Sequence, residues 1–480
     1  MKKILLLILL PIVSYSQTKI GNSINGKYPV SSGMASSFGT RLSLSGDGNI
    51  LAVGDQSIWS GEVRVYINTA NNWEELGSKI SIGNSPDEKG KSISLSKDGS
   101  ILAVGSPQGA GNGYETGFAQ VYQNIAGIWT QVGTNIKGKA GGEYSGSSIS
   151  LSEDGSTIAI GAPGNSQNKW QGGCVRAYKN VGDIWTKIGD DLYGKQDADN
   201  FGSRVVLANN GEIMAIGNKN KSISVFKNIA GTWTLLGNEI TGINSGFSFS
   251  ADGSTIAVPY TVIDYAPITY YRIITSYVKL LRLINGIWTQ VGISLKGNGE
   301  YSNFGSAISL SNDGSIIAIG APGKDEKGDE SGIVMVYKEN SGNWLKLGID
   351  IKGEAKYDRN GEGVSLSSDG TKLAVGSPYN DNVTGANAGA IRIFNLLPFL
   401  NTDQFVMSNF NLYPNPASEI VNVNLQDNFI IKKINIYNSL GQFIKTDNTD
   451  KINISSLSKG IYYFEIITDK GKGTKAIIVN

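Results

Sequence analysis

The stretch AISLSNDGSIIAIGAP (residues 307–322) contains the features that decide the fold. Residues 307–310 alternate apolar and polar side chains, which predicts a β-strand with one buried face. Asp313-Gly314 predicts a two-residue hairpin of type I′, because both central residues of that turn need a positive φ. Residues 316–319 are almost all apolar, which indicates a second strand buried on both faces.

This phrase occurs seven times along the chain. Its turns are separated by 42 to 61 residues and lie at Asp47-Gly48, Asp98-Gly99, Asp154-Gly155, Asn210-Gly211, Asp252-Gly253, Asp313-Gly314 and Asp369-Gly370. A second phrase, WxxxGxxIxG, follows each of the first six turns and begins at Trp73, Trp129, Trp185, Trp233, Trp288 and Trp344. In the sixth unit, residues 333–337 and 344–353 supply a third and a fourth strand. Four strands in each unit of about 50 residues are typical of a β-propeller. We therefore expect an all-β chain in which residues 17–398 form a seven-bladed β-propeller.

The two ends of the repeat array complement each other. After the seventh turn, residues 372–375 and 390–394 supply two more strands but no Trp phrase follows. Residues 17–26 (QTKIGNSING) match residues 185–194 (WTKIGDDLYG), with Gln17 in the Trp place. The start of the chain is thus expected to supply the outer strand of the last blade, which removes an exposed sheet edge.

The repeat resembles the FG-GAP repeat of integrin-α-type propellers over residues 17–398. The "FG" element is matched by Phe38-Gly39, Phe201-Gly202 and Phe304-Gly305, and the "GAP" element by residues 161–163 and 320–322. Members of that family often carry a DxDxDG calcium loop between the first two strands. Here the loop is short and its Asp-Gly or Asn-Gly pair offers one carboxylate at most, whereas calcium takes six to eight oxygen ligands. We therefore expect no metal site.

The C-terminal residues have a different pattern. Residues 399–410 are interpreted as a linker, and alternating strands follow in residues 411–480. This region resembles the type A C-terminal sorting domain of type IX secretion, a small Ig-like β-sandwich. The matching motif residues are Tyr413, Pro414, Asn415, Pro416, Gly441 and Gly460. The resemblance implies that the type IX secretion machinery is a partner and that the protein crosses the outer membrane.

The N-terminus has the pattern of a Sec signal peptide. Lys2 and Lys3 precede the apolar residues 4–13, and small residues predict cleavage between Ser16 and Gln17. Residues 1–16 are therefore expected to be removed on the way to the periplasm. Together with the sorting domain, this predicts a mature protein outside the cell or on the outer-membrane surface.

Composition narrows the chemistry that the chain can perform. It has no histidine, one cysteine and a net charge of +1, from 42 Lys and Arg against 41 Asp and Glu. The lack of histidine removes the commonest general base and metal ligand. The near-zero net charge gives no overall electrostatic attraction to nucleic acid. We expect a monomer without cofactor or enzymatic activity. The alternative is a secreted carbohydrate-active enzyme that uses paired carboxylates, with an acidic cluster at Asp325, Glu326, Asp329 and Glu330.

Aromatic residues recur in loops expected on one propeller face. Trp59, Tyr114, Trp170 and Tyr379 lie between the second and third strands, and Tyr144, Tyr301 and Tyr357 lie in loops that enter the next blade. The fifth unit has a longer insert, residues 260–277. Aromatic faces suit sugars and protein partners, so these residues form the predicted site for an extracellular glycan or protein ligand. The alternative is that they are scattered surface aromatics without a ligand. Cys174 and the repeated Trp residues are expected to be buried core.

Overall fold

The computed structural model describes residues 17–29, 37–55, 61–81, 90–242, 246–265, 272–340, 342–396, 410–425, 430–438, 442–468 and 471–480. The regular elements of these residues are all β-strands, and this part of the chain has no helix that could cross a membrane. The chain divides into two compact units, Ser16–Leu396 and a C-terminal unit described from Phe410 onward. The predicted signal peptide, with Ser16, and nearly all of the predicted linker lie outside the described residues.

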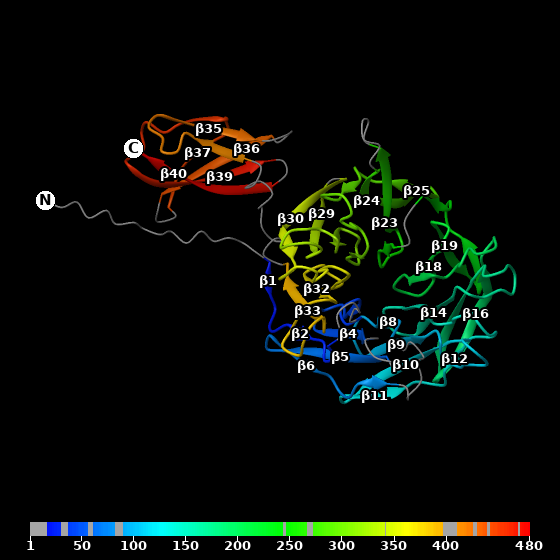
Figure 1. Cartoon of the computed structure of the whole chain (residues 1–480). Helices are drawn as coiled ribbons and strands as arrows, with labels where there is room; N and C mark the ends of the chain where they lie inside the picture. The colour runs from blue at the N-terminus through cyan, green and yellow to red at the C-terminus, as the bar shows by residue number, and fades with distance from the viewer. Residues whose placement is uncertain are drawn as a thin grey trace. The chain divides into compact units, whose positions relative to one another are not determined.

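The first unit consists of antiparallel sheets, seven in its described part, which Figure 1 shows side by side around a common axis. Sheet 1 contains β3 (Arg41–Leu44), β4 (Ile50–Asp55), β5 (Glu62–Thr69), β6 (Asn72–Glu75) and β7 (Ile80–Ser81). Sheet 2 contains β8 (Ser92–Leu95), β9 (Ile101–Ser106), β10 (Phe118–Ile125), β11 (Ile128–Gln131) and β12 (Ile136–Lys137). Sheet 3 contains β13 (Ser148–Leu151), β14 (Thr157–Ala162), β15 (Cys174–Val181) and β16 (Ile184–Tyr193).

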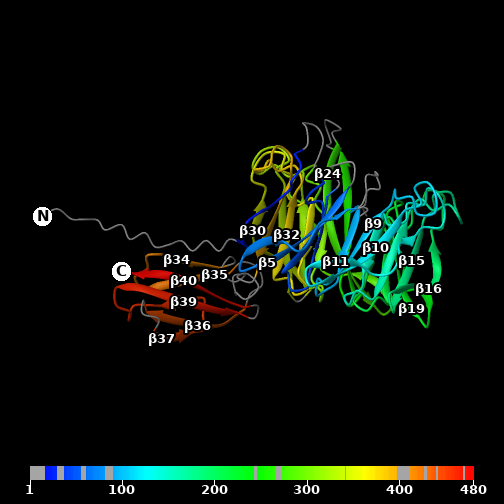
Figure 2. The same ribbon diagram turned by 90° about the horizontal axis from the view of Figure 1, so that it is seen from below.

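The next sheets repeat this order. Sheet 4 contains β17 (Arg204–Leu207), β18 (Ile213–Gly217), β19 (Ser222–Ile229), β20 (Thr232–Leu235) and β21 (Ile240–Thr241). Sheet 5 contains β22 (Ser248–Phe249), β23 (Thr255–Tyr265), β24 (Arg272–Ile284), β25 (Ile287–Gln290) and β26 (Leu295–Lys296). Sheet 6 contains β27 (Ile308–Leu310), β28 (Ile316–Ala321), β29 (Ile333–Asn340) and β30 (Asn343–Lys352). The insert in the fifth unit lengthens β23 and β24 into one hairpin, which projects in Figure 2 beyond the neighbouring strands.

Sheet 7 is built from both ends of the unit. It contains β31 (Gly363–Leu366), β32 (Lys372–Ser377), β33 (Ala390–Asn395), β1 (Thr18–Lys19) and β2 (Ile24–Asn25). Thr18 pairs with Asn395, and Ile24 pairs with Ile391. The predicted pairing of the start of the chain with residues 390–394 is therefore confirmed. Figure 1 shows the blue β1 and β2 beside the yellow-orange β32 and β33.

The first strands of successive sheets are joined by backbone hydrogen bonds near the turns. In each sheet one N–H donates to the carbonyl of the equivalent residue in the next sheet, over 2.7–3.0 Å. The residues in this series are Gly46, Lys97, Glu153, Asn209, Ala251, Asn312 and Ser368. The N–H of Ser368 donates to the carbonyl of Gly46 at 2.9 Å, so the series returns to sheet 1.

The repeated serines of the phrase SLS join the same strands through their side chains. The Ser43 hydroxyl, for example, accepts the N–H of Leu95 at 2.9 Å, and the Ser94 hydroxyl accepts that of Leu151 at 3.0 Å. The bond recurs wherever the repeat has Ser, and sheet 4 has Val206 instead. A buried N–H needs a partner, so this polar position inside an apolar strand has a structural reason.

The prediction of a type I′ hairpin at the Asp-Gly turns is wrong. Gly48 has a φ of 66°, whereas Asp47 is not among the residues with positive φ. Instead, the N–H of Gly48 donates to the carbonyl of Ser45 at 2.9 Å. The Asp47 carboxylate accepts the Ser45 hydroxyl at 2.6 Å and the N–H of Asn49 at 2.9 Å. The carboxylate bonds therefore favour a longer turn in which only the glycine is left-handed.

The repeated tryptophans lie between neighbouring sheets, mostly buried. In five of them the indole Nε1 donates to a backbone carbonyl of the preceding sheet at 2.9–3.2 Å; these are Trp73, Trp129, Trp185, Trp233 and Trp288. Each side chain thus combines apolar packing with one hydrogen bond between sheets. The prediction that these residues belong to the core is confirmed for the buried ones and modified for Trp129 and Trp185, which are half-buried.

The C-terminal unit is a small β-sandwich. One sheet contains β34 (Phe410–Tyr413), β35 (Ile420–Leu425) and β38 (Lys451–Asn453), and the other contains β37 (Phe443–Asp447), β36 (Ile431–Asn438), β39 (Gly460–Thr468) and β40 (Gly471–Val479). Its buried core includes Phe410, Val421, Ile434, Phe464 and Ile477. β34 begins at Phe410, one residue before the predicted start of this domain.

Candidate functional site

Two kinds of loop meet on one face of the first unit. The inner loop joins the second and third strands of a sheet, and the crossing loop leads from a sheet to the first strand of the next. In sheet 2 they are joined by three backbone hydrogen bonds: Gly142 N to Tyr114 O (3.0 Å), Tyr144 N to Glu115 O (3.2 Å) and Ser145 N to Thr116 O (2.9 Å). Sheets 3 and 6 repeat these bonds with residues 170–172 and 329–331 as acceptors. We call each joined pair a tip, and these bonds make the tips well-defined platforms.

The crossing loops after sheets 2, 3, 5 and 6, which the structure describes in full, each have two left-handed positions that the sequence alone did not separate. The first holds Gly142, Ala198, Tyr301 and Tyr357, and the second holds Tyr144, Asn200, Asn303 and Arg359, with φ values of 49° to 71°. Tyr144 lies in a crossing loop, as do Tyr301 and Tyr357, but it occupies the second left-handed position and the other two occupy the first. Its hydroxyl donates to the Glu115 carboxylate at 2.7 Å and its ring lies half-buried against Gly164 of the next sheet.

One exposed aromatic side chain stands at each tip that the structure describes. In sheets 2 and 3 it comes from the inner loop, as Tyr114 and Trp170, and a small residue faces it in the crossing loop. In sheet 6 the inner loop has Asp329 at this place, and Tyr357 of the crossing loop supplies the ring. Tyr301 occupies the crossing-loop place after sheet 5. The exposed fractions of Tyr114, Trp170, Tyr301 and Tyr357 are 81%, 63%, 60% and 51%.

The remaining predicted aromatics lie elsewhere. Trp59 is outside the described residues. Tyr379 is half-buried, with the Arg359 guanidinium 5.7 Å from its ring centre. The Lys356 ammonium lies 4.6 Å from the ring centre of Tyr357. Tyr357 and Tyr379 therefore lie at the same crossing loop, where each contacts a basic side chain of that loop. Tyr114 and Trp170 stand on separate sheets.

Buried carboxylates hold the crossing loops, and the sequence analysis did not identify them. A repeated Gly precedes the first strand of the next sheet, for example at Gly146, Gly202 and Gly361. Glu143, Asp199 and Asp358 occupy the equivalent position three residues before this repeated Gly, and each is buried. Asp358 accepts the N–H groups of residues 354 and 355 at 2.8 and 2.9 Å and the Asn380 amide at 3.1 Å. The spacing of an acidic residue from that Gly is the signal that could have revealed them.

Glu143 also belongs to a buried ion-pair network. Arg176 donates to Glu143 at 2.7 and 3.1 Å and to Asp191 at 2.8 Å, and Asp191 also binds Lys139 and Lys187 at 2.7 Å. Burial acts to raise the pKa of Asp191. Hydrogen bonds from Lys139, Lys187 and Arg176 outweigh that effect and hold the pKa well below its usual range. The network ties the crossing loop after sheet 2 to strands of sheet 3.

A cavity of about 440 Å³ lies at the axis where the crossing loops enter the first strands. Residues two positions after the repeated Gly contribute to its wall, among them Arg41, Ser148, Arg204 and Ala307. The tips therefore border this cavity, since Ser147, on its wall, bonds through its hydroxyl to the Tyr144 carbonyl at 2.7 Å. At the other end of the axis, Asn312 of sheet 6 donates to Glu153 of sheet 3.

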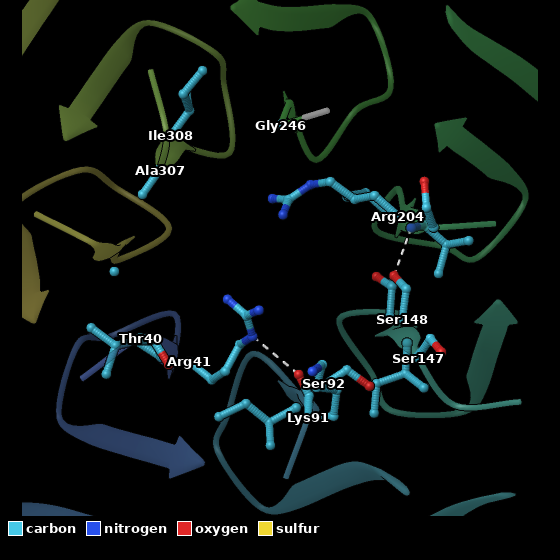
Figure 3. Close-up of a pocket in the computed structure, with 18 of the residues that line it drawn as sticks. Thr40, Arg41, Lys91, Ser92, Ser147, Ser148, Arg204, Gly246, Ala307 and Ile308 are labelled. Atoms are coloured by element: carbon cyan, nitrogen blue, oxygen red, sulfur yellow. Dashed lines mark hydrogen bonds between the residues drawn. The ribbon is translucent and has the colours of Figure 1, made fainter. Parts of the chain in front are cut away.

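Two arginine side chains extend into the centre of this cavity from sheets 1 and 4 (Figure 3). The Nε of Arg41 donates to the Lys91 carbonyl at 3.1 Å. The Arg204 guanidinium lies 5.4 Å from the ring centre of Phe247. Burial and then the positive charge of Arg41 lower the pKa of Arg204 to about 10, so both groups remain cationic at neutral pH.

The other candidates for chemistry are engaged in structure. In the acidic cluster, Glu326 pairs with Lys352 at 2.9 Å and Asp329 with Lys356 at 2.7 Å, and these cations lower both carboxyl pKa values. Cys174 is fully buried at the β15 position equivalent to Ile333 in β29, as predicted, and burial raises the pKa of its thiol to about 12. Among the described residues, no group of three His, Cys, Asp or Glu could hold a metal ion.

In the C-terminal unit, the motif YPNPA (residues 413–417) packs along β40. The Asn415 side chain donates to the Ala476 carbonyl at 3.1 Å and accepts the N–H of Ile478 at 2.9 Å. Tyr413 is half exposed, Pro414 and Pro416 are exposed, and Gly460 begins β39. Gly441 lies outside the described residues.

Comparisons with known proteins agree with this architecture. Residues 411–480 match the family model for the secretion system C-terminal sorting domain, which confirms the sorting domain. The chain is similar to the hydrazine synthase of Kuenenia stuttgartiensis, with a TM-score of 0.50 and 14% identity, over 76% of this chain and 98% of that chain. A protein from Lactobacillus plantarum aligns with a TM-score of 0.45 and 15% identity, over 65% of this chain and 85% of that one. No curated protein matches the chain.

At such identities the likeness concerns the fold alone. It supports an all-β, β-propeller-like architecture followed by the sorting domain. The FG-GAP resemblance stays a prediction.

Proposed function

We propose that residues 17–396 form a seven-bladed, non-catalytic propeller that acts outside the cell and binds an extended glycan across its loop face. The sorting domain implies export by the type IX machinery to the cell surface or the extracellular space. Support for seven blades comes from the series of hydrogen bonds between first strands, which returns from Ser368 to Gly46. The FG-GAP repeat pattern is consistent with the same proposal.

The observation that carries the binding proposal is the recurrence of one exposed aromatic ring at each described tip. Exposed aromatic rings contribute little to the stability of a fold. Binding residues gather in neighbouring loops on a rigid scaffold. The rings stand on separate sheets, so a small ligand could not reach all of them. A polymer with repeating sugar units could stack one sugar on each ring, which favours a polysaccharide over a small molecule.

The proposal of a non-catalytic role rests on the state of the carboxylates. A glycosidase needs one carboxyl group with a raised pKa beside a second carboxylate. Glu326 and Asp329 have lowered pKa values because lysines hydrogen-bond them. Glu362 is the one carboxylate on the described wall of the axial cavity, and it pairs with Arg359 at 3.3 Å. These facts favour binding over hydrolysis.

A glycan array probed with the mature chain, residues 17–480, tests the proposal. We expect retention on polysaccharides of several sugar units and weak or no retention on the corresponding monosaccharides. Incubation of the retained polysaccharide with the protein, followed by measurement of reducing ends, separates binding from hydrolysis. Release of reducing ends would favour the enzyme, and absence of retention on every polysaccharide would contradict the binding role.

A further inference from the structure

The axial cavity concentrates positive charge. Its described wall contains two arginines, Arg41 and Arg204, together with Lys91, which has a partner of its own, and one anionic residue, Glu362. Glu362 pairs with Arg359, and its negative charge also acts on Arg41, where it opposes the lowering of the pKa by burial. The wall is otherwise dominated by serine and apolar side chains and by backbone. The cavity is therefore electropositive, although the whole chain is nearly neutral with a net charge of +1.

The two arginines converge on the centre of the cavity. They come from equivalent positions of sheets 1 and 4, and Figure 3 shows both guanidinium groups directed into the open centre. Neither is in an ion pair within 4.0 Å among the described residues, and the buried Nε of Arg204 has no hydrogen-bond partner there. Two positive charges that face one another repel, and a buried donor without a partner, such as the Arg204 Nε, is unfavourable as well.

We propose that this cavity is an oxyanion site in which Arg41 and Arg204 together hold a carboxylate, sulfate or phosphate group. Guanidinium groups donate in a planar fork that matches such oxyanions, and charge-assisted hydrogen bonds are the strong ones. Stacking of Arg204 on Phe247 and the bond from Arg41 to the Lys91 carbonyl fix the two side chains before the anion arrives. Pre-organised donors lower the entropic cost of binding.

The size of the cavity allows more than a bare ion. Ligand pockets of about 300–1,000 Å³ hold small organic molecules, so about 440 Å³ is room for an acidic sugar. The oxyanion could therefore be free in solution or be the acidic group of a polysaccharide that lies across the tips. The second source rests on the proposed function, whereas the oxyanion site itself does not.

Isothermal titration calorimetry, in which anions are titrated into the mature full-length chain at low ionic strength, tests the site. The probes are sodium sulfate, sodium phosphate, trigalacturonate and the neutral methyl ester of trigalacturonate. We expect one sulfate or phosphate per chain, binding at least tenfold weaker in Arg41→Gln and in Arg204→Gln, and lost in the double variant. Arg41→Lys, which keeps the charge but not the fork, should bind more weakly than the wild type and more tightly than Arg41→Gln.

The matched control removes two positive charges from the same face outside the cavity, in the variant Lys169→Gln/Lys195→Gln. It should bind as the wild type does. Thermal unfolding supplies a second measurement, because an anion that binds the folded state raises the melting temperature of the wild type but not of the arginine double variant. Equal binding by wild type and double variant, or no binding of any oxyanion, would overturn the site.

The glycan probes distinguish the two sources. Arginine-dependent binding of trigalacturonate but not of its ester identifies the acidic sugar. If inorganic anions bind and every glycan fails, the oxyanion site stands and the proposed glycan function falls. If glycans bind the arginine variants and the wild type equally, the glycan function stands and the oxyanion site falls.

Discussion

The side-chain amide of Gln17 donates a 2.7 Å hydrogen bond to the backbone carbonyl of Ile349. Gln17 stands where the other repeats have Trp, and Ile349 belongs to β30 of the preceding sheet. Five of the six repeated indoles make the same kind of bond to the sheet before them, for example Trp73 to the Ile20 carbonyl at 3.2 Å. An N–H donor at this position, rather than an aromatic ring, is thus the feature that persists where sheets 6 and 7 meet.

This relationship predicts the effect of removing the start of the mature chain. Deletion of residues 17–26 exposes the edge of β33 and removes the buried Ile24, so we expect a loss of about 3 kcal/mol or more in the free energy of unfolding. Gln17→Ala alone should cost about 1 kcal/mol, the worth of one hydrogen bond. Urea unfolding measures both. An unchanged midpoint in the deletion variant would show that sheet 7 does not depend on this segment.

Replacement of a buried and of an exposed tryptophan should have different effects on the stability of the protein. Trp288 is buried, and its indole bonds to the Leu236 carbonyl at 3.0 Å, so Trp288→Ala should cost about 3–5 kcal/mol. Trp170 is exposed at a tip, so Trp170→Ala should change stability by no more than about 0.5 kcal/mol. Chemical denaturation followed by circular dichroism compares the two. Similar losses in both variants would contradict the assignment of core and surface roles.

The fold was readable from sequence because its determinants are local and repeated. The phrase SLSxDGS carries the strand pattern, the turn and the serine that joins neighbouring strands, and the match of residues 17–26 to 185–194 located the last strand of sheet 7. The type I′ error arose because a carboxylate such as that of Asp47 bonds within its own turn, an effect that the dipeptide alone does not reveal.

The site was harder to predict for a physical reason. The exposed aromatics Tyr114 and Trp170 followed from loop position. Loop position alone does not tell which ring is exposed, because Tyr144 lies two residues before Gly146, whereas Tyr301 and Tyr357 lie four residues before Gly305 and Gly361. Arg41 and Arg204 are far apart in sequence, and their convergence depends on the arrangement of the sheets around the axis. Their shared place two residues after the repeated Gly becomes informative only once that position is known to face the cavity.

Low pH should reduce the stability of the protein in part through protonation of Asp191. Because its pKa is lowered in the folded state, its carboxylate contributes stability above the unfolded pKa of about 3.9, and this contribution is lost as the pH falls through the lower folded value. In Asp191→Asn the free energy of unfolding should be lower at pH 7 and should fall less steeply below pH 4. Asp190→Asn, at the exposed neighbouring position, should keep the wild-type profile. Urea unfolding between pH 2.5 and pH 7 measures the wild type and both variants. Identical profiles would exclude Asp191 as a source of the acid sensitivity.

Binding should depend on the tips together. Single replacement of Tyr114, Trp170 or Tyr357 by Ala is expected to weaken polysaccharide binding by about tenfold, since a buried aromatic anchor contributes on the order of 1–2 kcal/mol or more. The triple variant should weaken it by a larger factor, with unchanged circular dichroism and melting temperature. Ile184→Ala serves as control, because Ile184 is 68% exposed at the hairpin of β15 and β16 away from the tips. Wild-type affinity in the triple variant would place the glycan elsewhere.

Export should require the sorting domain and the turn that packs along its last strand. Deletion of residues 411–480 is expected to leave the first unit in the periplasm of a host with type IX secretion, because a Sec signal carries a protein across the inner membrane only. Asn415→Ala removes the two bonds to β40 and should reduce export, whereas Asn424→Ala, on β35 without those bonds, should not. Fractionation with immunoblotting gives the location of each variant, and a periplasmic marker enzyme controls for lysis. Extracellular appearance of the truncated chain without release of the marker would contradict the role of this domain.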